Sequence, residues 1–176
     1  PDAPAPAVSE LTIGLMISIM RSIQIANMNM HQGNWNRFFG RRFEDLTIGI
    51  IGLGRIGKRV LDNLNGFRCK EILLSDLVED HDIASKSDIR WVDKETIYSD
   101  SDLITLHIPL NRSTHNLIGS KEIAMMKDDV MLVNTSRGGI IDEIELYNGL
   151  KNGKIASAAI DVFEIEPYEG NLSSLD

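Results

Sequence analysis

The feature that most constrains this chain is a β-branched run that leads directly into three spaced glycines. Residues 47–51 are rich in isoleucine, and Gly52, Gly54 and Gly57 follow, the last of them at the start of a predicted helix over 56–64. In a strand–turn–helix unit of this kind, the first glycine makes the tight turn, the second lets the backbone approach a pyrophosphate, and the third permits close helix–sheet packing. The N–H groups at the helix N-terminus would hold the phosphates. The pattern predicts a dinucleotide site, and the glycines alone suit NAD or FAD.

Short β-branched runs alternate with helical stretches through the rest of the chain. Several runs are continuously apolar, as expected for parallel strands covered on both faces. This alternation predicts an α/β fold of the Rossmann type, a doubly wound parallel sheet with right-handed crossovers. Strands are predicted over 47–51, 71–75, 89–92, 103–108, 130–134 and 156–162, and helices over 56–64, 94–98, 120–126 and 142–152.

An acidic residue stands where such a fold binds the adenosine ribose. Asp76 falls 19 residues after Gly57, at the end of the second predicted strand. A carboxylate there accepts hydrogen bonds from the ribose hydroxyls and repels a 2′-phosphate. Because Leu77 and Val78 follow, rather than an arginine, the sequence favours NAD over NADP. The alternative is that Asp76 is an ordinary exposed carboxylate at the end of a strand.

Charge and cysteine content limit the other partners. The formal net charge is −8, which opposes binding to nucleic acid or to an anionic membrane, because both require a basic face. The single cysteine, Cys69, favours a reducing compartment, so we expect a cytoplasmic protein. No histidine lies at metal-ligand spacing from Cys69, and no metal site is expected. The most apolar window, 11–20, is too short to span a bilayer.

The N-terminal part differs from the rest. Ser9 is the predicted N-cap of one helix that runs to about Met30 and is apolar on several sides. Such a helix requires several apolar partners, from a second subunit, an absent domain or its own domain. Residues 33–42 then interleave aromatic residues with arginines, which can mark a nucleic-acid-binding segment. In an acidic protein, a loop packed on a neighbouring surface is the favoured interpretation.

Three further motifs follow the glycine turn. They are Leu-His-Ile-Pro-Leu at 106–110 with Thr114, Asn-Thr-Ser-Arg-Gly-Gly at 134–139, and Asp-Val-Phe-Glu-Ile-Glu-Pro at 161–167. With the glycine turn, this ordered set closely resembles the D-isomer-specific 2-hydroxyacid dehydrogenases, from about residue 8 to residue 167. That family includes enzymes of the phosphoglycerate, D-lactate, glyoxylate/hydroxypyruvate and formate types.

The resemblance implies roles for individual residues. Arg137 matches the arginine that binds the substrate carboxylate and carbonyl, a role that suits a permanently charged, bidentate guanidinium. Glu166 matches the glutamate that keeps a catalytic histidine basic, and Asp161 matches the acid near the nicotinamide carboxamide. The positions that match contacts to the dinucleotide are Arg55, Ile56, Asp76, Ile108, Pro109, Thr114, Thr135 and Ser136.

Without the family, some of these residues have simpler interpretations. Arg137 would cap a turn, and Glu166 would belong to a solvated acidic loop. The counterpart of His107 in the family is not the acid/base histidine. The remaining histidines are expected on the surface or in loops, at His31, His81 and His115.

The resemblance also implies parts of the protein that lie outside this sequence. In the family, the proton-transferring histidine follows the Glu-Pro motif in a Pro-His segment, and the substrate domain flanks the cofactor domain on both sides. We therefore expect residues 1–176 to be an NAD-binding domain without its substrate domain. Within it, 1–45 would form an N-terminal segment, helix and loop, and 46–167 the Rossmann core. Asp45 and Leu46 stand where the family usually has Gly-Lys.

Together these inferences predict part of an NAD-dependent oxidoreductase that passes hydride between nicotinamide and a small D-2-hydroxy acid or 2-keto acid. The isolated chain would bind NAD with little turnover. The N-terminal helix resembles one that helps to form a dimer in the family, so a homodimer is expected. The alternative is an NAD-sensing corepressor or regulatory module on the same fold. No nucleic-acid or membrane partner is expected.

Overall fold

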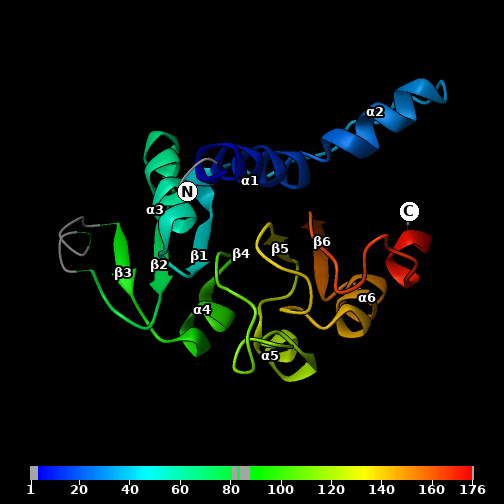
Figure 1. The fold of residues 1–176 in the computed structure, drawn as a ribbon. Helices are drawn as coiled ribbons and strands as arrows, with labels where there is room; N and C mark the ends of the chain where they lie inside the picture. Colours follow the sequence, from blue (N-terminus) through cyan, green and yellow to red (C-terminus); the bar gives the residue numbers. More distant parts are fainter. Residues whose placement is uncertain (1–3, 81–82, 84–87, 176) are drawn as a thin grey trace.

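The computed structural model describes residues 4–80, 83 and 88–175, which are built around one parallel sheet (Figure 1). The strands are β1 (Thr47–Ile51), β2 (Glu71–Ser75), β3 (Ile89–Trp91), β4 (Leu103–Leu106), β5 (Val130–Asn134) and β6 (Ile155–Ile160). Their order in the sheet is β3-β2-β1-β4-β5-β6, and each neighbouring pair is parallel. This is the strand order of a Rossmann fold, so the predicted fold class is confirmed.

Helices cover both faces of the sheet, as the continuously apolar strands predict. α1 (Ala5–Met20) and α3 (Arg55–Leu64) lie on one face, and α4 (Lys94–Asp100), α5 (Ser120–Met125) and α6 (Glu143–Lys151) lie on the other (Figure 1). Successive side chains of a strand point to opposite faces and therefore enter different cores. Ile72 and Leu74 pack in the layer of α1 and α3, whereas Leu73 packs in the layer of α4, α5 and α6. The elements from β1 onward agree with the predictions to within two residues at each end.

The prediction of one N-terminal helix from Ser9 to about Met30 is wrong. α1 begins at Ala5 and ends at Met20, and α2 (Ile23–His31) follows at an angle of 63°. Between them, Ser22 adopts a left-handed conformation with a φ of 51°, which interrupts the helical ladder. Ser9 is not a cap: it is buried within α1, and its hydroxyl donates to the carbonyl oxygen of Pro6 (2.8 Å).

α1 and α2 differ in how they are packed. α1 buries a stripe spaced by three or four residues, Ala5, Ser9, Thr12, Met16 and Met20. Two members of this stripe carry hydroxyl groups, so the apolar pattern alone does not reveal which side of the helix faces the sheet. α2 buries none of its residues and projects away from the sheet (Figure 1). No single helix in the described ranges is long and apolar enough to cross a membrane, although the bent pair of α1 and α2 meets that test jointly.

Candidate functional site

The candidate site lies at the edge of the sheet where β1 and β4 end. β1 pairs with β2 on one side and with β4 on the other, so the strand order reverses here. In open α/β sheets, ligands bind in the crevice outside the carboxyl ends of the strands at such a point. The backbone N–H of Gly52 donates to the carbonyl oxygen of Ser75, and that of His107 to Ile51, both at 2.8 Å. These bonds place the glycine turn beside the start of the 106–110 motif.

The three glycines of the turn have different surroundings. Gly52 has a φ of +97°, and a Cβ there would lie 2.5 Å from the carbonyl oxygen of His107. A Cβ on Gly57 would lie 2.0 Å from the carbonyl oxygen of Gly52, so a side chain would push α3 away from the turn. Gly54, by contrast, has no atom of a packed neighbour within 4 Å of its Cβ position in the part of the chain that the structure describes. Packing within the chain explains Gly52 and Gly57, whereas the space beside Gly54 is open for a ligand.

The first turn of α3 faces this open space. Gly54 is the N-cap residue of α3, with an extended backbone, and no side chain caps the helix. A helix N-terminus offers backbone N–H groups and the positive end of the helix dipole to an anion. Residues 54–57, which include Arg55 and Ile56, therefore fit the diphosphate of a dinucleotide.

Asp76 turns toward the glycine turn. Its Oδ2 accepts a hydrogen bond from the backbone N–H of Leu53 (2.5 Å), and its Oδ1 accepts one from that of Leu77 (2.6 Å). The residue remains exposed at the end of β2, and a carboxylate oxygen can accept more than one bond. Asp76 thus lies where an acid for the adenosine ribose is predicted. The bond to Leu53 is a link that the sequence does not reveal.

A hollow of about 570 Å³ lies beside Asp76, and three of its seven lining residues are acidic. Lys58 forms an ion pair there with Asp80 (Nζ to Oδ2, 2.7 Å). Three carboxylates against one ammonium group would oppose a 2′-phosphate, because like charges repel. The lining residues are Leu53, Gly54, Lys58, Asp76, Val78, Glu79 and Asp80.

His107 lies beneath the turn. Its Nε2 is 3.0 Å from the hydroxyl oxygen of Thr105, whereas its Nδ1 is buried and has no hydrogen-bond partner among the described residues. Burial disfavours the charged imidazolium and lowers the pKa of His107 to about 4. The ring is therefore neutral near pH 7 and unsuited to donating a proton there.

The segment after β4, residues 107–114, is partly hydrogen-bonded within itself. The methyl group Cγ2 of Ile108 borders the glycine turn, 2.7 Å from the Cβ position of Gly52. The hydroxyl of Thr114 donates to the carbonyl oxygen of Pro109 (2.6 Å) and accepts from the backbone N–H of Asn111 (2.8 Å). Ile108 thus borders the crevice, whereas the hydroxyl of Thr114 is used within its own loop.

Asn134 organises the loop that carries Arg137. Its Nδ2 donates to the carbonyl oxygen of Arg137 (2.9 Å), and its Oδ1 accepts from the N–H (3.0 Å) and the hydroxyl (2.7 Å) of Ser136. Arg137 itself is exposed, and its Nη1 donates to the carbonyl oxygen of Ser136 (2.6 Å). A guanidinium has five N–H donors, so further donors remain for an anionic ligand.

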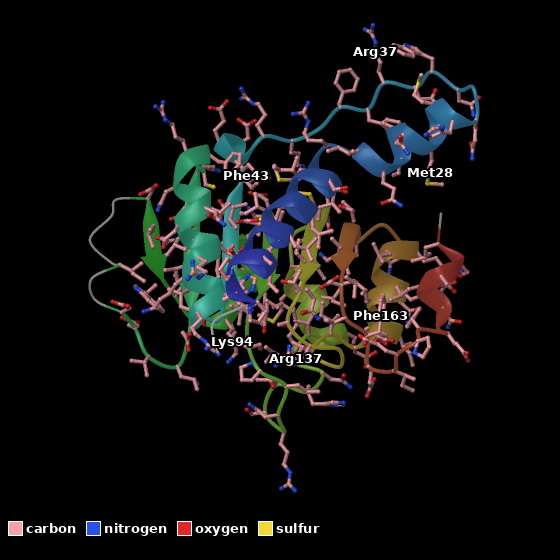
Figure 2. All side chains as sticks on the ribbon, turned by 45° about the horizontal axis from the view of Figure 1, so that its top comes forward. Met28, Arg37, Phe43, Lys94, Arg137 and Phe163 are labelled. Atoms are coloured by element: carbon pink, nitrogen blue, oxygen red, sulfur yellow. The ribbon has the colours of Figure 1, made fainter. Side chains whose placement is uncertain are left out.

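Residues 161–167 lie against this loop. A Cβ on Gly138 would lie 2.0 Å from the carbonyl oxygen of Phe163, and Figure 2 shows Phe163 and Arg137 at the same edge of the molecule. The backbone N–H of Asp161 donates to the carbonyl oxygen of Asn134 (3.0 Å). Glu166 accepts from the backbone N–H of Phe163 (3.0 Å). The structure thus brings Arg137, Asp161 and Glu166 to one edge, but these described side chains are not joined by a hydrogen bond or ion pair.

Two other histidines differ in their surroundings. His115 is exposed, as expected, but has a partner that the sequence does not indicate: its Nε2 is 3.3 Å from a carboxylate oxygen of Glu164. His31 is exposed at the end of α2. His81 lies outside the described residues.

Thr135 lies in the same loop as Arg137, but its side chain is held by α1. Its Oγ1 is 2.9 Å from Oγ1 of Thr12, and both residues are buried. The apolar pattern of α1 does not indicate Thr12, and no role was predicted for Asn134. The available signals were a hydroxyl residue one turn from Ser9 on α1, and an amide residue that closes an otherwise apolar strand.

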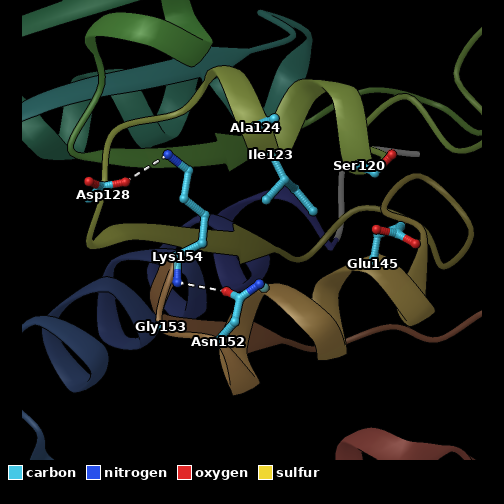
Figure 3. Close-up of a pocket in the computed structure, with 9 residues that line it drawn as sticks. Ser120, Ile123, Ala124, Asp128, Glu145, Asn152, Gly153 and Lys154 are labelled. Carbon is cyan, nitrogen blue, oxygen red and sulfur yellow. Dashed lines mark hydrogen bonds and ion pairs between the residues drawn. The ribbon is translucent and has the colours of Figure 1, made fainter.

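A larger hollow, of about 720 Å³, lies between α5 and α6 and shares no lining residue with the hollow beside Asp76 (Figure 3). Lys154 reaches across it and donates to the carbonyl oxygen of Met126 (2.6 Å) and to Asp128 (2.8 Å). Its charged group is therefore used to hold the turn before β5. In the part of the chain that the structure describes, no group of three or more His, Cys, Asp or Glu residues is arranged to hold a metal ion.

Comparison with known proteins adds independent findings. The family model described as "D-isomer specific 2-hydroxyacid dehydrogenase, NAD binding domain" matches residues 13–176. The chain is 40% identical to hydroxypyruvate reductase of Thermotoga maritima over 169 residues, which are 95% of this chain and 54% of that protein. It is 42% identical to D-3-phosphoglycerate dehydrogenase of Methanocaldococcus jannaschii over an alignment of 180 positions, gaps included, that covers 100% of this chain and 34% of that protein.

Solved structures agree with these matches. The crystal structure of a glyoxylate reductase from Paecilomyes thermophila has a TM-score of 0.87 and 34% identity, covering 96% of this chain and 51% of that one. D-lactate dehydrogenase from Aquifex aeolicus, complexed with NAD and lactic acid, has a TM-score of 0.84 and 31% identity, covering 89% of this chain and 47% of that one. The chain thus spans from about a third to about half of the length of these relatives.

Proposed function

Since the chain belongs to the D-isomer-specific 2-hydroxyacid dehydrogenase family, as its NAD-binding domain, we propose that it holds NAD for the oxidation of a small D-2-hydroxy acid or the reduction of the 2-keto acid. When bound, NAD supplies the hydride acceptor or donor for carbon 2 of the substrate. The relatives act, by their names, on hydroxypyruvate, phosphoglycerate, glyoxylate and lactate. All of these are small acids with oxygen on the carbon next to the carboxyl group.

The observation that carries the proposal is the contact between Asp76 and the glycine turn. Asp76 accepts from Leu53 at 2.5 Å, beside the open space at Gly54. This arrangement offers helix N–H groups to a diphosphate and a carboxylate to an unphosphorylated ribose at the same time. We assign Gly52, Gly54, Arg55, Ile56, Gly57 and Asp76 to this half of the cofactor site.

The second half of the site lies after β4, β5 and β6. We assign Ile108, Pro109, Thr114, Thr135, Ser136 and Asp161 to the remainder of the cofactor. Arg137 would bind the substrate carboxylate, because its guanidinium is exposed and only one of its N–H donors is used in the hydrogen bonds of the described chain. Glu166 would keep a histidine from outside residues 1–176 basic enough to exchange the substrate proton.

The domain boundaries follow from the same assignment. We propose that 46–167 forms the Rossmann core and that the substrate domain belongs to sequence outside this chain, since the relatives are longer by a factor of about two or three.

The buried free thiol of Cys69 supports a reducing compartment, and we propose the cytoplasm.

We further propose a homodimer through the N-terminal arm, defined as α2 together with residues 32–39. The arm exposes Ile23, Ile25, Met28, Met30, Trp35 and Phe39, and Figure 2 shows Met28 and Arg37 apart from the body of the molecule. Apolar side chains gathered on a projecting segment are typical of a subunit interface. Light scattering should give a dimer for the unchanged chain and a monomer for Met28→Asp combined with Ile25→Asp. Gln24→Glu, which changes an exposed polar residue of α2, should remain dimeric.

The proposed function is tested by calorimetric titration of the chain with NAD and NADP. We expect NAD to bind and NADP to bind at least tenfold more weakly. In the complete protein, NADH consumption with hydroxypyruvate, glyoxylate or pyruvate should be rapid and should fall by several orders of magnitude in Arg137→Ala. NAD binding without turnover on any 2-keto acid would instead favour a regulatory module. Failure of the chain to bind NAD would overturn the proposal.

A further inference from the structure

We propose that Thr12 is a positioning residue for the cofactor, because its hydroxyl holds that of Thr135 as a hydrogen-bond acceptor toward the nicotinamide nucleotide. The inference rests on the proposed function, namely that NAD occupies the crevice. Thr12 belongs to α1, outside the strand–turn–helix unit and outside the three later motifs, so no sequence motif points to it.

The contacts form a short chain of three oxygen atoms. The hydroxyl oxygen of Thr12 is 2.8 Å from the carbonyl oxygen of Val8 and 2.9 Å from the hydroxyl oxygen of Thr135. Thr12 is fully buried, and Thr135 is 5% exposed. Water therefore does not replace these bonds, and each proton in the chain has a defined place.

The direction of each bond follows from the carbonyl group. A carbonyl oxygen only accepts, so the single proton of the Thr12 hydroxyl is given to Val8. Thr12 then has no proton left for Thr135, and the bond between the two hydroxyls must use the proton of Thr135. The oxygen of Thr135 is left with a free lone pair and without a free proton. Toward the crevice it can accept a hydrogen bond but cannot donate one.

The position of Thr135 selects the part of the cofactor that it would contact. A Rossmann fold consists of two mononucleotide-binding halves. Asp76 follows β2, in the half that would hold the adenosine, whereas Thr135 follows β5, in the other half. The other nucleotide of NAD has two kinds of hydrogen-bond donor, the carboxamide N–H groups and the ribose hydroxyls. An acceptor fixed at Thr135 fits either of them.

Thr135 and its neighbours are held by different parts of the chain. Asn134 holds Ser136 and Arg137 through its amide group, whereas the hydroxyl of Thr135 is held by α1. α1 and the loop after β5 thus meet at Thr135, which is assigned to the cofactor and lies two positions before Arg137, which is assigned to the substrate. Loss of the Thr12 hydroxyl would let the Thr135 proton rotate freely, so that it competes with the donor of the ligand.

The experiment compares three variants of α1 by calorimetric titration with NAD. Thr12→Val removes the hydroxyl and keeps the shape, so we expect NAD to bind about five- to tenfold more weakly, the effect of one lost hydrogen bond. Thr12→Ser restores the hydroxyl and should bind within twofold of the unchanged chain. Ser9→Ala is the matched control, because Ser9 is also buried on α1 but, among the described residues, its hydroxyl bonds only to the carbonyl of Pro6. It should leave NAD affinity unchanged.

Titration with a second ligand identifies which group of the cofactor donates a hydrogen bond to Thr135. In 3-acetylpyridine adenine dinucleotide, a methyl group replaces the carboxamide nitrogen, and the ribose is retained. If Thr135 accepts from the carboxamide, Thr12→Val should not weaken the binding of this analogue. If Thr135 accepts from the ribose, Thr12→Val should weaken the binding of the analogue as much as that of NAD. Both results support the inference and differ in the group that is recognised.

Three results would overturn the inference: unchanged NAD affinity in Thr12→Val, an equal loss in Ser9→Ala, or no recovery in Thr12→Ser. Thermal unfolding of each variant checks that it is folded, and Thr12→Ala, which suits a helix interior, replaces Thr12→Val if the latter does not fold. Failure of the unchanged chain to bind NAD would overturn the proposed function as well, whereas normal binding with an inert Thr12 would overturn this inference alone.

Discussion

The two halves of the sheet complete their parts of the crevice in different ways. In the half formed by β1, β2 and β3, short-range contacts shape the site: Gly57 lies against Gly52, and Asp76 accepts from Leu53, 23 positions away, while Gly52 also meets His107 after β4. In the half formed by β4, β5 and β6, one buried contact crosses most of the chain. Thr135 is bonded to Thr12, 123 positions away, whereas Gly138 lies against Phe163, only 25 positions away.

The two halves also differ in the roles assigned to them: the first would bind the adenosine end of the cofactor, and the second carries the residues assigned to catalysis. The first half has its own contacts in place, and a dinucleotide needs only to occupy the space beside Gly54. In the second half, Arg137 and Glu166 are exposed, and each is bonded to its own loop rather than to the other. We therefore expect changes in the first half to act directly on cofactor affinity or on folding, and changes in the second half to act through the position of a loop.

The largest effect is expected at Gly57, where the first half of the sheet has no spare volume. In Gly57→Ala, a Cβ only 2.0 Å from the backbone of Gly52 would force α3 away from β1. Overpacking of this kind costs about 3 kcal/mol of unfolding free energy, and NAD affinity should fall more than a hundredfold. Urea unfolding and calorimetry measure the two quantities. Gly66→Ala is the control, since nothing lies within 4 Å of its Cβ position. Unchanged NAD affinity in Gly57→Ala would contradict this account of the first half.

His107, which lies between the two halves, should make stability depend on pH. Its pKa is about 4 in the folded chain and about 6.5 when exposed to water. Between these values the unfolded chain binds a proton that the folded chain does not, so stability falls as the pH is lowered from 6.5 toward 4. Between pH 7 and pH 5, the free energy of unfolding should fall by about 2 kcal/mol because of His107. Urea unfolding of the unchanged chain and of His107→Asn at both pH values measures it by difference. Equal pH dependence in the two proteins would contradict this account.

Asp76 should set the preference between NAD and NADP. Asp76→Asn removes the charge while keeping an oxygen that accepts from Leu53. We expect NAD to bind about tenfold more weakly, the effect of about 1.4 kcal/mol from one charged hydrogen bond, and the ratio of NADP to NAD affinity to rise. Asp62→Asn, an exposed carboxylate on α3, is the control. If NAD affinity is insensitive to Asp76→Asn, the first half is not anchored as described.

The smallest effect is expected at the contact between His115 and Glu164, in the second half. The two side chains are about half-exposed and 3.3 Å apart, so solvent screens their attraction. Glu164→Gln should lower the unfolding free energy by less than about 0.5 kcal/mol. Guanidinium unfolding of this variant and of His115→Gln checks the value. A loss above about 1 kcal/mol would show that this pair, rather than the buried contacts at Thr135 and Gly138, holds the second half together.

The sequence alone determined the α/β fold, the glycine turn and the position of Asp76. Each of these depends on spacing within a few tens of residues: a strand has a period of two residues and a helix one of 3.6, and only glycine fits where Gly57 meets Gly52. The residues of the later motifs were found by resemblance, and their roles remain predictions.

Tertiary structure alone decided where α1 breaks, which side of it is buried, and that Thr12 meets Thr135. The break at Ser22 and the two hydroxyl residues in the buried stripe leave no apolar pattern to follow. A hydrogen bond between residues 123 positions apart exists only because α1 docks across β5, and that docking depends on the shape of the whole sheet. Periodicity describes a single element, whereas a contact between elements depends on how all of them fit together.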